Sequence, residues 1–169
     1  MEHGVQVIMD RIGYPGSMIS KIGPCFMEQT KNKVHIRSAL GNKNLDINEN
    51  KMQNGTPIIL YEHHRGENQI FYPVYNSDNT VSFKIKNYVI DVKNGEAFNV
   101  AVIQLWECNN TLAQKFYIVD AFFGEYTIHS AIDPTFVLDV KNGENIDGNT
   151  IQLYKLNLTK AQRFKLINP

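Results

Sequence analysis

Two stretches of this sequence repeat each other: YVIDVKNGEAFNVAVIQLWECNNTLAQKFYIV (Tyr88–Val119) and FVLDVKNGENIDGNTIQLYKLNLTKAQRFKLI (Phe136–Ile167). They align without a gap, 48 residues apart, and share DVKNGE, IQL and a closing A-Q-x-F. A third copy, LDINENKMQNGTPIILYEHHRGENQIFYPV (Leu45–Val74), lies upstream and keeps fewer letters. Recurrence of this kind indicates a fold assembled from similar supersecondary units.

The spacing inside the copies is constant. An interval of 15 residues separates the aspartate from the aromatic residue in the pairs Asp46–Tyr61, Asp91–Trp106 and Asp139–Tyr154. The glutamine of the closing step follows the aromatic residue by 8 residues, at Gln69, Gln114 and Gln162. Because all three copies keep both intervals, they are predicted to share one local structure.

Each copy is predicted to be β structure. Residues 34–38, 81–86 and 125–130 alternate apolar and polar side chains, as half-buried strands do. The Asn-Gly pairs at 94–95 and 142–143 are typical of turns with positive φ, and no stretch shows a sustained helical period. Each repeat then holds about four short strands, and closing about twelve strands into a barrel removes exposed edges. The expected fold is all-β with pseudo-threefold symmetry.

The pattern D-V-x-x-G, then Q-L-W, then Q-x-F, resembles the ricin B-type lectins and the family 13 carbohydrate-binding modules, whose fold is the β-trefoil. The resemblance covers residues 32–169, with repeats at about 32–79, 80–123 and 124–169. It implies that the Q-x-F steps belong to the core and that each repeat can hold one shallow sugar site. Residues 1–31 form an apolar N-terminal extension, which is expected to pack on the barrel or to anchor a partner protein.

A sugar site needs a carboxylate for vicinal hydroxyls, an amide, and an aromatic platform for the C–H face. In the strand Ile103-Gln104-Leu105-Trp106, alternation places Gln104 and Trp106 outward and the two apolar residues in the core. Together with Asp91, this outward pair is the first candidate for carbohydrate binding. The alternative is that Trp106 covers a neighbouring loop.

The other two copies offer related sets. The candidate sugar-binding residues there are Asp139, Gln152 and Tyr154 in the third copy, and Asp46, Tyr61 and Asn68 in the first. Ile59 stands where the first copy would carry the glutamine. An aspartate at a strand end also caps its own turn through backbone N–H groups, so both roles stay open for the three aspartates. Galactose-binding members of the family carry an asparagine before the closing glutamine, at the position of Ala113 and Ala161.

Other polar residues are assigned less specific roles. The closing glutamines precede a core phenylalanine by two residues, so they are expected to be buried structural amides. His63 and His64 could reach a ligand or a metal, or be solvated. No third ligand stands at metal spacing, so neither a metal nor a cofactor is expected. The G-x-S-x-G, H-E-x-x-H and P-loop motifs are absent from the sequence, which favours a protein without catalytic residues.

The composition of the chain limits the classes of partner that it is expected to bind. The chain has 17 basic and 17 acidic side chains and no formal net charge, which argues against nucleic acid as the main partner. No apolar stretch is long enough to span a bilayer, and no secretory signal is visible. The disulfide positions of ricin-like members hold Val89 and Cys108, Asn44 and His63, and Val137 and Leu156. With no disulfide inside a repeat, a cytoplasmic location is favoured over secretion.

The sequence therefore predicts a non-enzymatic module that binds a glycan, of galactose type or another hexose, at up to three shallow sites. The alternative is a β-trefoil that has lost sugar binding and serves as a protein-interaction subunit of a larger assembly, held through residues 1–31 or a loop. A trefoil protease inhibitor is a further alternative. The identity of the sugar, the partner and the oligomeric state stay open.

Overall fold

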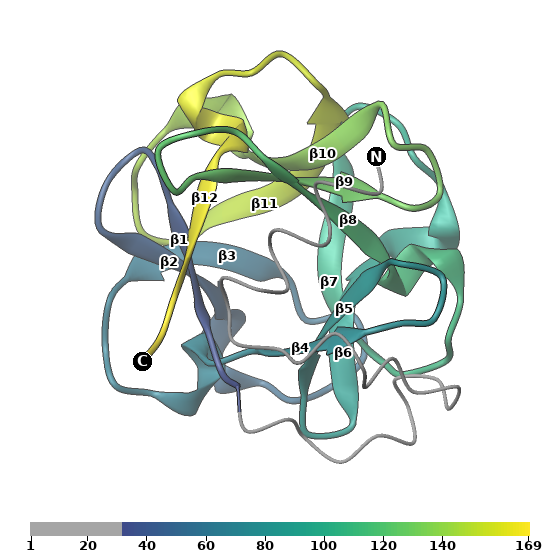
Figure 1. The fold of residues 1–169 in the computed structure, drawn as a ribbon. Helices are drawn as coiled ribbons and strands as arrows, with labels where there is room; N and C mark the ends of the chain where they lie inside the picture. The colour runs from purple at the N-terminus through teal and green to yellow at the C-terminus, as the bar shows by residue number, and fades with distance from the viewer. Residues whose placement is uncertain (1–31) are drawn as a thin grey trace.

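The computed structural model describes residues 32–169, so the predicted role of residues 1–31 lies outside the described residues. Each repeat contributes four strands (Figure 1). They are β1 (His35–Ser38), β2 (Lys43–Ile47), β3 (Ile58–Glu62) and β4 (Tyr72–Tyr75); β5 (Val81–Ile85), β6 (Tyr88–Val92), β7 (Ala101–Glu107) and β8 (Phe116–Asp120); β9 (Tyr126–Ser130), β10 (Phe136–Val140), β11 (Asn149–Lys155) and β12 (Phe164–Ile167). The predicted all-β fold is confirmed.

Six of the strands close into a barrel. Antiparallel pairing runs from β1 through β12, β9, β8 and β5 to β4. An isolated bridge between Val34 and Phe71 then joins the start of β1 to the start of β4. The ring is closed by this bridge, which removes the exposed edges that an open sheet would have.

The other six strands form three hairpins, β2–β3, β6–β7 and β10–β11. The hairpins contact one another because β11 pairs with both β3 and β7, and because Pro57 bridges to Gln104. In Figure 1 the repeats surround a common centre, in blue, teal-green and yellow-green. This combination of a six-stranded barrel and a hairpin triplet is the predicted β-trefoil, with its pseudo-threefold symmetry.

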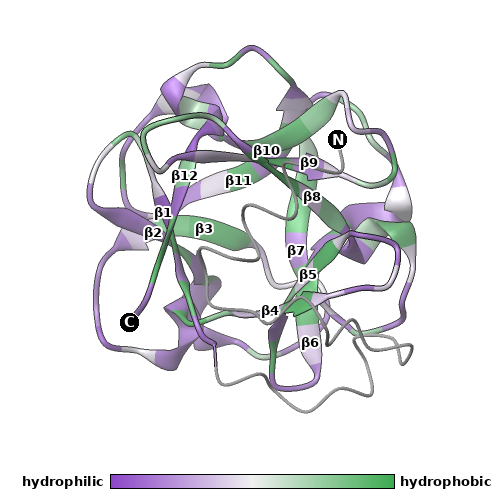
Figure 2. Ribbon diagram, viewed as in Figure 1, coloured by the Kyte–Doolittle hydropathy of each residue, from purple (hydrophilic) through white to green (hydrophobic). Residues whose placement is uncertain are grey.

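Alternation of side chains decides which residues fill the interior. The fully buried residues include the apolar partners of the hairpin strands and the phenylalanines of the Q-x-F steps: Ile103, Leu105, Ile151, Leu153, Phe71, Phe116 and Phe164. Figure 2 shows apolar strands around the centre and hydrophilic turns at the periphery. The sequence predicted both groups as core, and burial of this kind is the main stabilising contribution to the fold.

Single turns of 3-10 helix connect the strands: η2 (Asn48–Asn50), η3 (Glu67–Gln69), η4 (Lys93–Gly95), η5 (Leu112–Gln114), η6 (Lys141–Gly143) and η7 (Lys160–Gln162). In η4, Asn94 and Gly95 have φ values of 62° and 66°. Glycine adopts this left-handed conformation freely and asparagine tolerates it, which accounts for the Asn-Gly pair. Among the helical segments that the structure describes, none is long and apolar enough to cross a membrane.

The residues at the disulfide positions of ricin-like members make other contacts in this chain. Asn44 and His63 are joined by a hydrogen bond of 3.0 Å between Nδ2 and Nδ1, so a polar contact replaces the covalent one in the first repeat. In the second repeat, Cys108 is disulfide-bonded, and it is the only cysteine among residues 32–169.

Candidate functional site

A buried aspartate organises a polar network in each repeat. Asp91 lies on β6, is 5% exposed, and stands opposite Gln104 of β7 in the strand register. The Gln104 Nε2 donates to Asp91 Oδ1 over 2.9 Å, and the Gln114 Nε2 donates to Asp91 Oδ2 over 3.1 Å. A carboxylate can accept about four hydrogen bonds. Each oxygen of Asp91 therefore keeps capacity for a further donor.

Gln114 ties this network to the main chain. Its Nε2 also donates to the carbonyl of Glu107 over 2.9 Å, and its Oε1 accepts from the backbone N–H of Asn109 over 2.8 Å. The side chain is fully buried. The prediction of a structural amide is confirmed, and the geometry adds that Gln114 holds the carboxylate of Asp91 in place.

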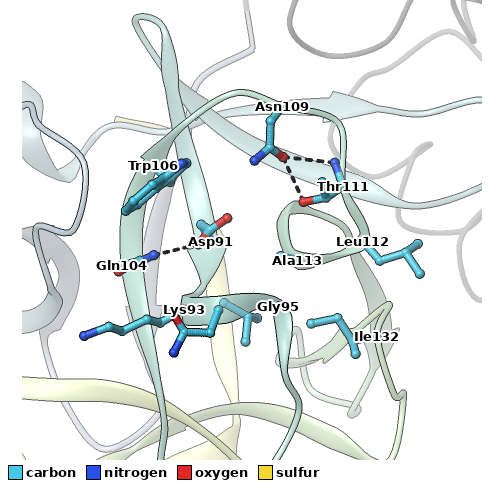
Figure 3. A pocket seen from close by; sticks show the side chains of 12 residues that line it. Asp91, Lys93, Gly95, Gln104, Trp106, Asn109, Thr111, Leu112, Ala113 and Ile132 are labelled. Carbon is cyan, nitrogen blue, oxygen red and sulfur yellow. Dashed lines mark hydrogen bonds between the residues drawn. The ribbon is translucent and has the colours of Figure 1, made fainter.

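A cavity of about 620 Å³ lies over Asp91. We call it the second site because Asp91 belongs to the second repeat. Figure 3 shows Trp106 and Gln104 on one side of this cavity and Leu112 and Ile132 on the other. Trp106 is 37% exposed, so part of its aromatic surface is available to a ligand. Ile132 belongs to the turn between β9 and β10 of the next repeat. The wall of the second site is therefore built by two repeats.

The loop after β7 adds an amide at the rim. Asn109 Oδ1 accepts hydrogen bonds from the backbone N–H and the hydroxyl of Thr111, over 3.1 and 2.8 Å. In Figure 3 the amide nitrogen of Asn109 is turned toward the side of the cavity that Trp106 occupies. Sequence reasoning missed this residue, although N-x-T recurs at 109–111 and 157–159. Asn109 supplies an amide in a site where Ala113 supplies none.

The third repeat builds a similar site over Asp139. Gln152 Nε2 donates to Asp139 Oδ1 over 3.0 Å, and Gln162 Nε2 donates to Asp139 Oδ2 over 3.1 Å. Like Gln114, Gln162 also donates to one main-chain carbonyl and accepts from one main-chain N–H. The cavity of this third site measures about 440 Å³ and is lined by Tyr154 and, from the first repeat, by Leu40. Tyr154 is half-buried.

The first repeat departs from this pattern. Ile59 cannot bind the carboxylate, and Asn68 Nδ2 donates to Asp46 Oδ1 over 2.8 Å instead. Gln69 Nε2 and His64 Nε2 both contact Asp46 Oδ2, at 2.8 and 3.1 Å. Three protein groups therefore occupy the carboxylate of the first site, against two in each of the others. Its cavity is also smaller, at about 250 Å³.

The neighbouring turn explains the smaller first cavity. The turns that carry Leu40 and Ile132 are the four residues 39–42 and the five residues 131–135, whereas residues 86–87 alone join β5 to β6. By the threefold relation, this short turn is the one beside the first site. Its Lys86 side chain lies 3.9 Å from Glu67 at the surface. The first site therefore lacks the apolar wall that a longer turn provides in the other two.

His64 is part of the first site. The backbone N–H of Gly66 donates to His64 Nδ1 over 2.9 Å. Nδ1 is therefore unprotonated, and Nε2–H is the donor to Asp46. The His64 ring also lies edge-on to the ring of Tyr61, with a centroid distance of 6.0 Å. Within residues 32–169, no group of three or more His, Cys, Asp or Glu side chains is placed to hold a metal.

The environment of the three aspartates shifts their acidity in one direction. Burial raises the pKa of Asp46, Asp91 and Asp139 above the ordinary value of 3.8, because the charged form loses hydration. The hydrogen bonds from the surrounding amides act the opposite way and stabilise the carboxylate. The network thus keeps a desolvated anion beneath an open cavity, where its charge is screened little by water.

The nine candidate residues fall into three clusters, one in each repeat. Gln104 and Gln152 lie on the outward face of their strands, as predicted, and line their cavities. They are only 4% and 6% exposed, and each is bound to the aspartate of its repeat. The alternative role of the aspartates is not observed among the described residues. The carboxylates are bound by amide and imidazole side chains, and not by the backbone of their own turns.

Comparison with known proteins identified one matching family. The family model described as the ricin-type beta-trefoil lectin domain matches residues 32–164. A comparison with curated proteins found no match.

Three solved structures illustrate the likeness of fold. ThreeFoil, a designed 3-fold symmetric protein, has a TM-score of 0.78 and 21% identity, with coverage of 81% of this chain and 99% of its own. An exo-beta-1,3-galactanase from Clostridium thermocellum has a TM-score of 0.80 and 19% identity over 85% of this chain, which spans only 31% of that enzyme. The ricin B-like lectin of Macrolepiota procera, in complex with lactose, has a TM-score of 0.66 and 14% identity, with coverage of 85% and 99%.

Proposed function

Because the chain belongs to the ricin-type β-trefoil lectin family, we propose that it is a non-enzymatic carbohydrate-binding module for galactose-type sugars, with working sites over Asp91 and Asp139. The ricin B-like lectin of similar fold from Macrolepiota procera is in complex with lactose, which makes lactose the first ligand to test. The neutral charge of the chain suits a neutral sugar, since no charged field is needed to attract it.

The proposal rests on the hydrogen-bonding capacity that the Asp91 carboxylate still has. Each oxygen of Asp91 accepts one amide N–H from the protein and retains capacity for another donor. Two vicinal sugar hydroxyls present two such donors in a matching geometry, and hydrogen bonds to a charged acceptor are the strong ones. Burial of the carboxylate makes these bonds stronger than they would be in water.

The aromatic platform supplies the second half of the recognition. A sugar whose hydroxyls reach Asp91 would place its C–H face against the exposed part of Trp106, where apolar contact and aromatic polarisation both favour it. Ile132 closes the opposite side and reduces the access of water. Tyr154 and Leu40 repeat this arrangement in the third site.

The three sites are expected to differ in strength. The second has the largest cavity and the largest platform, the third is intermediate, and the first has the smallest cavity and a carboxylate already bound by Asn68, Gln69 and His64. Single open sites of this kind bind with a Kd on the order of mM, or roughly 4 kcal/mol. Useful retention on a glycan surface then comes from two sites acting together.

The experiment is a glycan array with purified protein and the Trp106→Ala variant. We expect loss of most sugar retention with an unchanged circular dichroism spectrum, because the Trp106 side chain lies at the surface of β7. Phe98→Ala is the matched control, since Phe98 is an aromatic residue that is 49% exposed and outside the three cavities. Equal retention by wild type and Trp106→Ala would refute the assignment.

One surface feature favours the alternative function, a protein-interaction subunit. Phe122 and Phe123 are 72% and 96% exposed at the turn between β8 and β9. Both have positive φ, 69° and 55°, a strained conformation for a bulky residue. Two exposed aromatic side chains held in strained backbone are typical of residues retained for a contact, because neither burial nor backbone preference explains them.

This alternative is tested by replacing both residues. The variant Phe122→Ser/Phe123→Ser should lose any partner that co-purifies with the wild-type chain at fixed stoichiometry, while sugar retention on the array stays the same. A partner that remains bound to the double variant would exclude this turn as the contact surface.

A further inference from the structure

One backbone position recurs in all three repeats with a left-handed conformation. It is occupied by Gly55, Val100 and Gly148, which are 45 and 48 residues apart, as the three aspartates are. Their φ values are 87°, 68° and 82°. The backbone N–H of each donates to a strand of another repeat, at Leu105, Leu153 and Leu60 respectively. Two of the three positions hold glycine, and the second repeat alone places a β-branched side chain there.

This position lies across from the aromatic platform of a neighbouring repeat. In the pairing of β7 with β11, Val102 is opposite Gln152 and Ala101 is opposite Leu153, so Val100 is next in line, opposite Tyr154. Hydrogen bonds on both sides hold it there, from Val100 N to the Leu153 carbonyl at 2.8 Å and from Lys155 N to Asn99 Oδ1 at 2.9 Å. Residues directly opposite in an antiparallel pair project to the same face.

The same strand register occurs at the other two sites, but there the residue opposite the aromatic platform is glycine. Asn149 is opposite Leu60, so Gly148 is opposite Tyr61 of the first site. Pro57 bridges to Gln104, so Gly55 is opposite Trp106 of the second site. At both glycines, an added Cβ atom would meet nothing within 4 Å. An added side chain would therefore find open space at this position in the first and second sites, and only the third has a side chain there.

The conformation of Val100 is not explained by stability. A β-branched residue with positive φ is a genuine outlier, and glycine would adopt the same backbone without strain. The valine side chain is 56% exposed, so little burial offsets that strain. It does, however, line the cavity of the third site together with Tyr154, Asp139 and Leu40. Strained residues that persist beside a site are often retained for function.

We propose that Val100 is a specificity-determining residue of the third site, where it extends the apolar platform of Tyr154. The second site uses a wide tryptophan opposite a glycine, and the third uses a narrower tyrosine opposite a valine. The ring and the valine methyl groups together present an apolar surface to the C–H face of a sugar. The inference rests on the proposed function, because it assigns a role within a glycan site.

The test is a titration with lactose followed by NMR, with the backbone amides of Gly95 and Gly143 as reporters of the second and third sites. Both glycines line their cavities, so each reports a separate Kd. In Val100→Gly we expect Kd at Gly143 to rise about tenfold, the effect of losing one apolar contact, with Kd at Gly95 unchanged. Val100→Thr keeps the shape and the β-branch, and it should also weaken the third site.

A rescue variant separates the platform from a change in loop mobility. Val100→Gly/Tyr154→Trp converts the third site to the pairing of the second site, and it should bring Kd at Gly143 back to within about threefold of wild type. The inference is overturned if Val100→Gly leaves Kd at Gly143 unchanged, or if Val100→Thr binds like wild type. If lactose shifts neither glycine in the wild-type chain, the proposed function fails and the role of Val100 fails with it, which is a different result from failure at Gly143 alone.

Discussion

Replacing Gln114 with methionine should destabilise the fold more than the same replacement of Gln104, the other amide of the second site. Methionine has nearly the same shape and volume, so the variant leaves little cavity. It removes the amide bonds to the Asp91 carboxylate, to the Glu107 carbonyl and from the Asn109 N–H. The effect measured is then the loss of hydrogen bonds from groups that remain in the folded protein.

The expected loss in the free energy of unfolding depends on how deeply the three groups that lose a hydrogen bond are buried. An unsatisfied buried polar group costs about 1–3 kcal/mol, and a charged one lies at the upper end. Asp91 is buried and charged, whereas the main-chain groups of Glu107 and Asn109 are only partly buried, so water can replace part of their bonds at about 1 kcal/mol each. We expect a loss of about 3–5 kcal/mol, against a usual total stability of about 5–15 kcal/mol.

Urea unfolding at neutral pH measures this loss, and Gln104→Met is the matched control. Gln104 makes a single side-chain bond, to Asp91 Oδ1, so its replacement should cost about 1 kcal/mol. A difference between the two variants below about 1 kcal/mol would refute the view that Gln114 is the structural tie of the site.

Three further predictions concern acidity, the apolar walls and the β8–β9 turn. Because burial raises the pKa of Asp91 above 3.8, lactose binding should fall on acidification through that raised value. The folded state binds this proton more tightly than the unfolded chain, so the contribution of Asp91 to stability rises as the pH falls through the same window. Calorimetric titration with lactose across that window measures the loss of binding, and binding that stays constant would contradict the assignment. Ile132→Ser should weaken lactose binding several-fold at the second site and Leu40→Ser at the third, each without effect on the other in NMR titration. Phe123→Asn should raise the free energy of unfolding by up to about 1 kcal/mol, because asparagine tolerates positive φ and the exposed ring loses no burial; destabilisation would show that the ring makes contacts that support the fold.

The sequence predicted the fold closely because the decisive information is local and repeated. Two constant intervals, from Asp91 to Trp106 and from Trp106 to Gln114, recur in the other copies and mark equivalent points of each unit. Strand alternation also placed Trp106 at the surface and Leu105 in the core. Both properties depend on residues near one another in the chain, which a pattern of period 2 reveals.

The site was predicted less completely, and the gaps share a cause. Alternation placed Gln104 on the outward face but gave no measure of its burial, which is set by the loops that fold over that face. Asn109 was missed because its place in the cavity depends on the path of the loop after β7. The role of His64 was left open, and its bond to Asp46 depends on how a loop returns to β2.

By itself, the sequence determined three β units with an aspartate and an aromatic residue on one face of each. Only the tertiary structure decided how the repeats complete one another: Ile132 and Leu40 form walls in the sites of other repeats, and Val100 lies across from Tyr154. These contacts join residues that are far apart in the chain, and the register between strands of different repeats sets them. A register is a property of the closed barrel and its hairpins, so no local pattern in one repeat can reveal it.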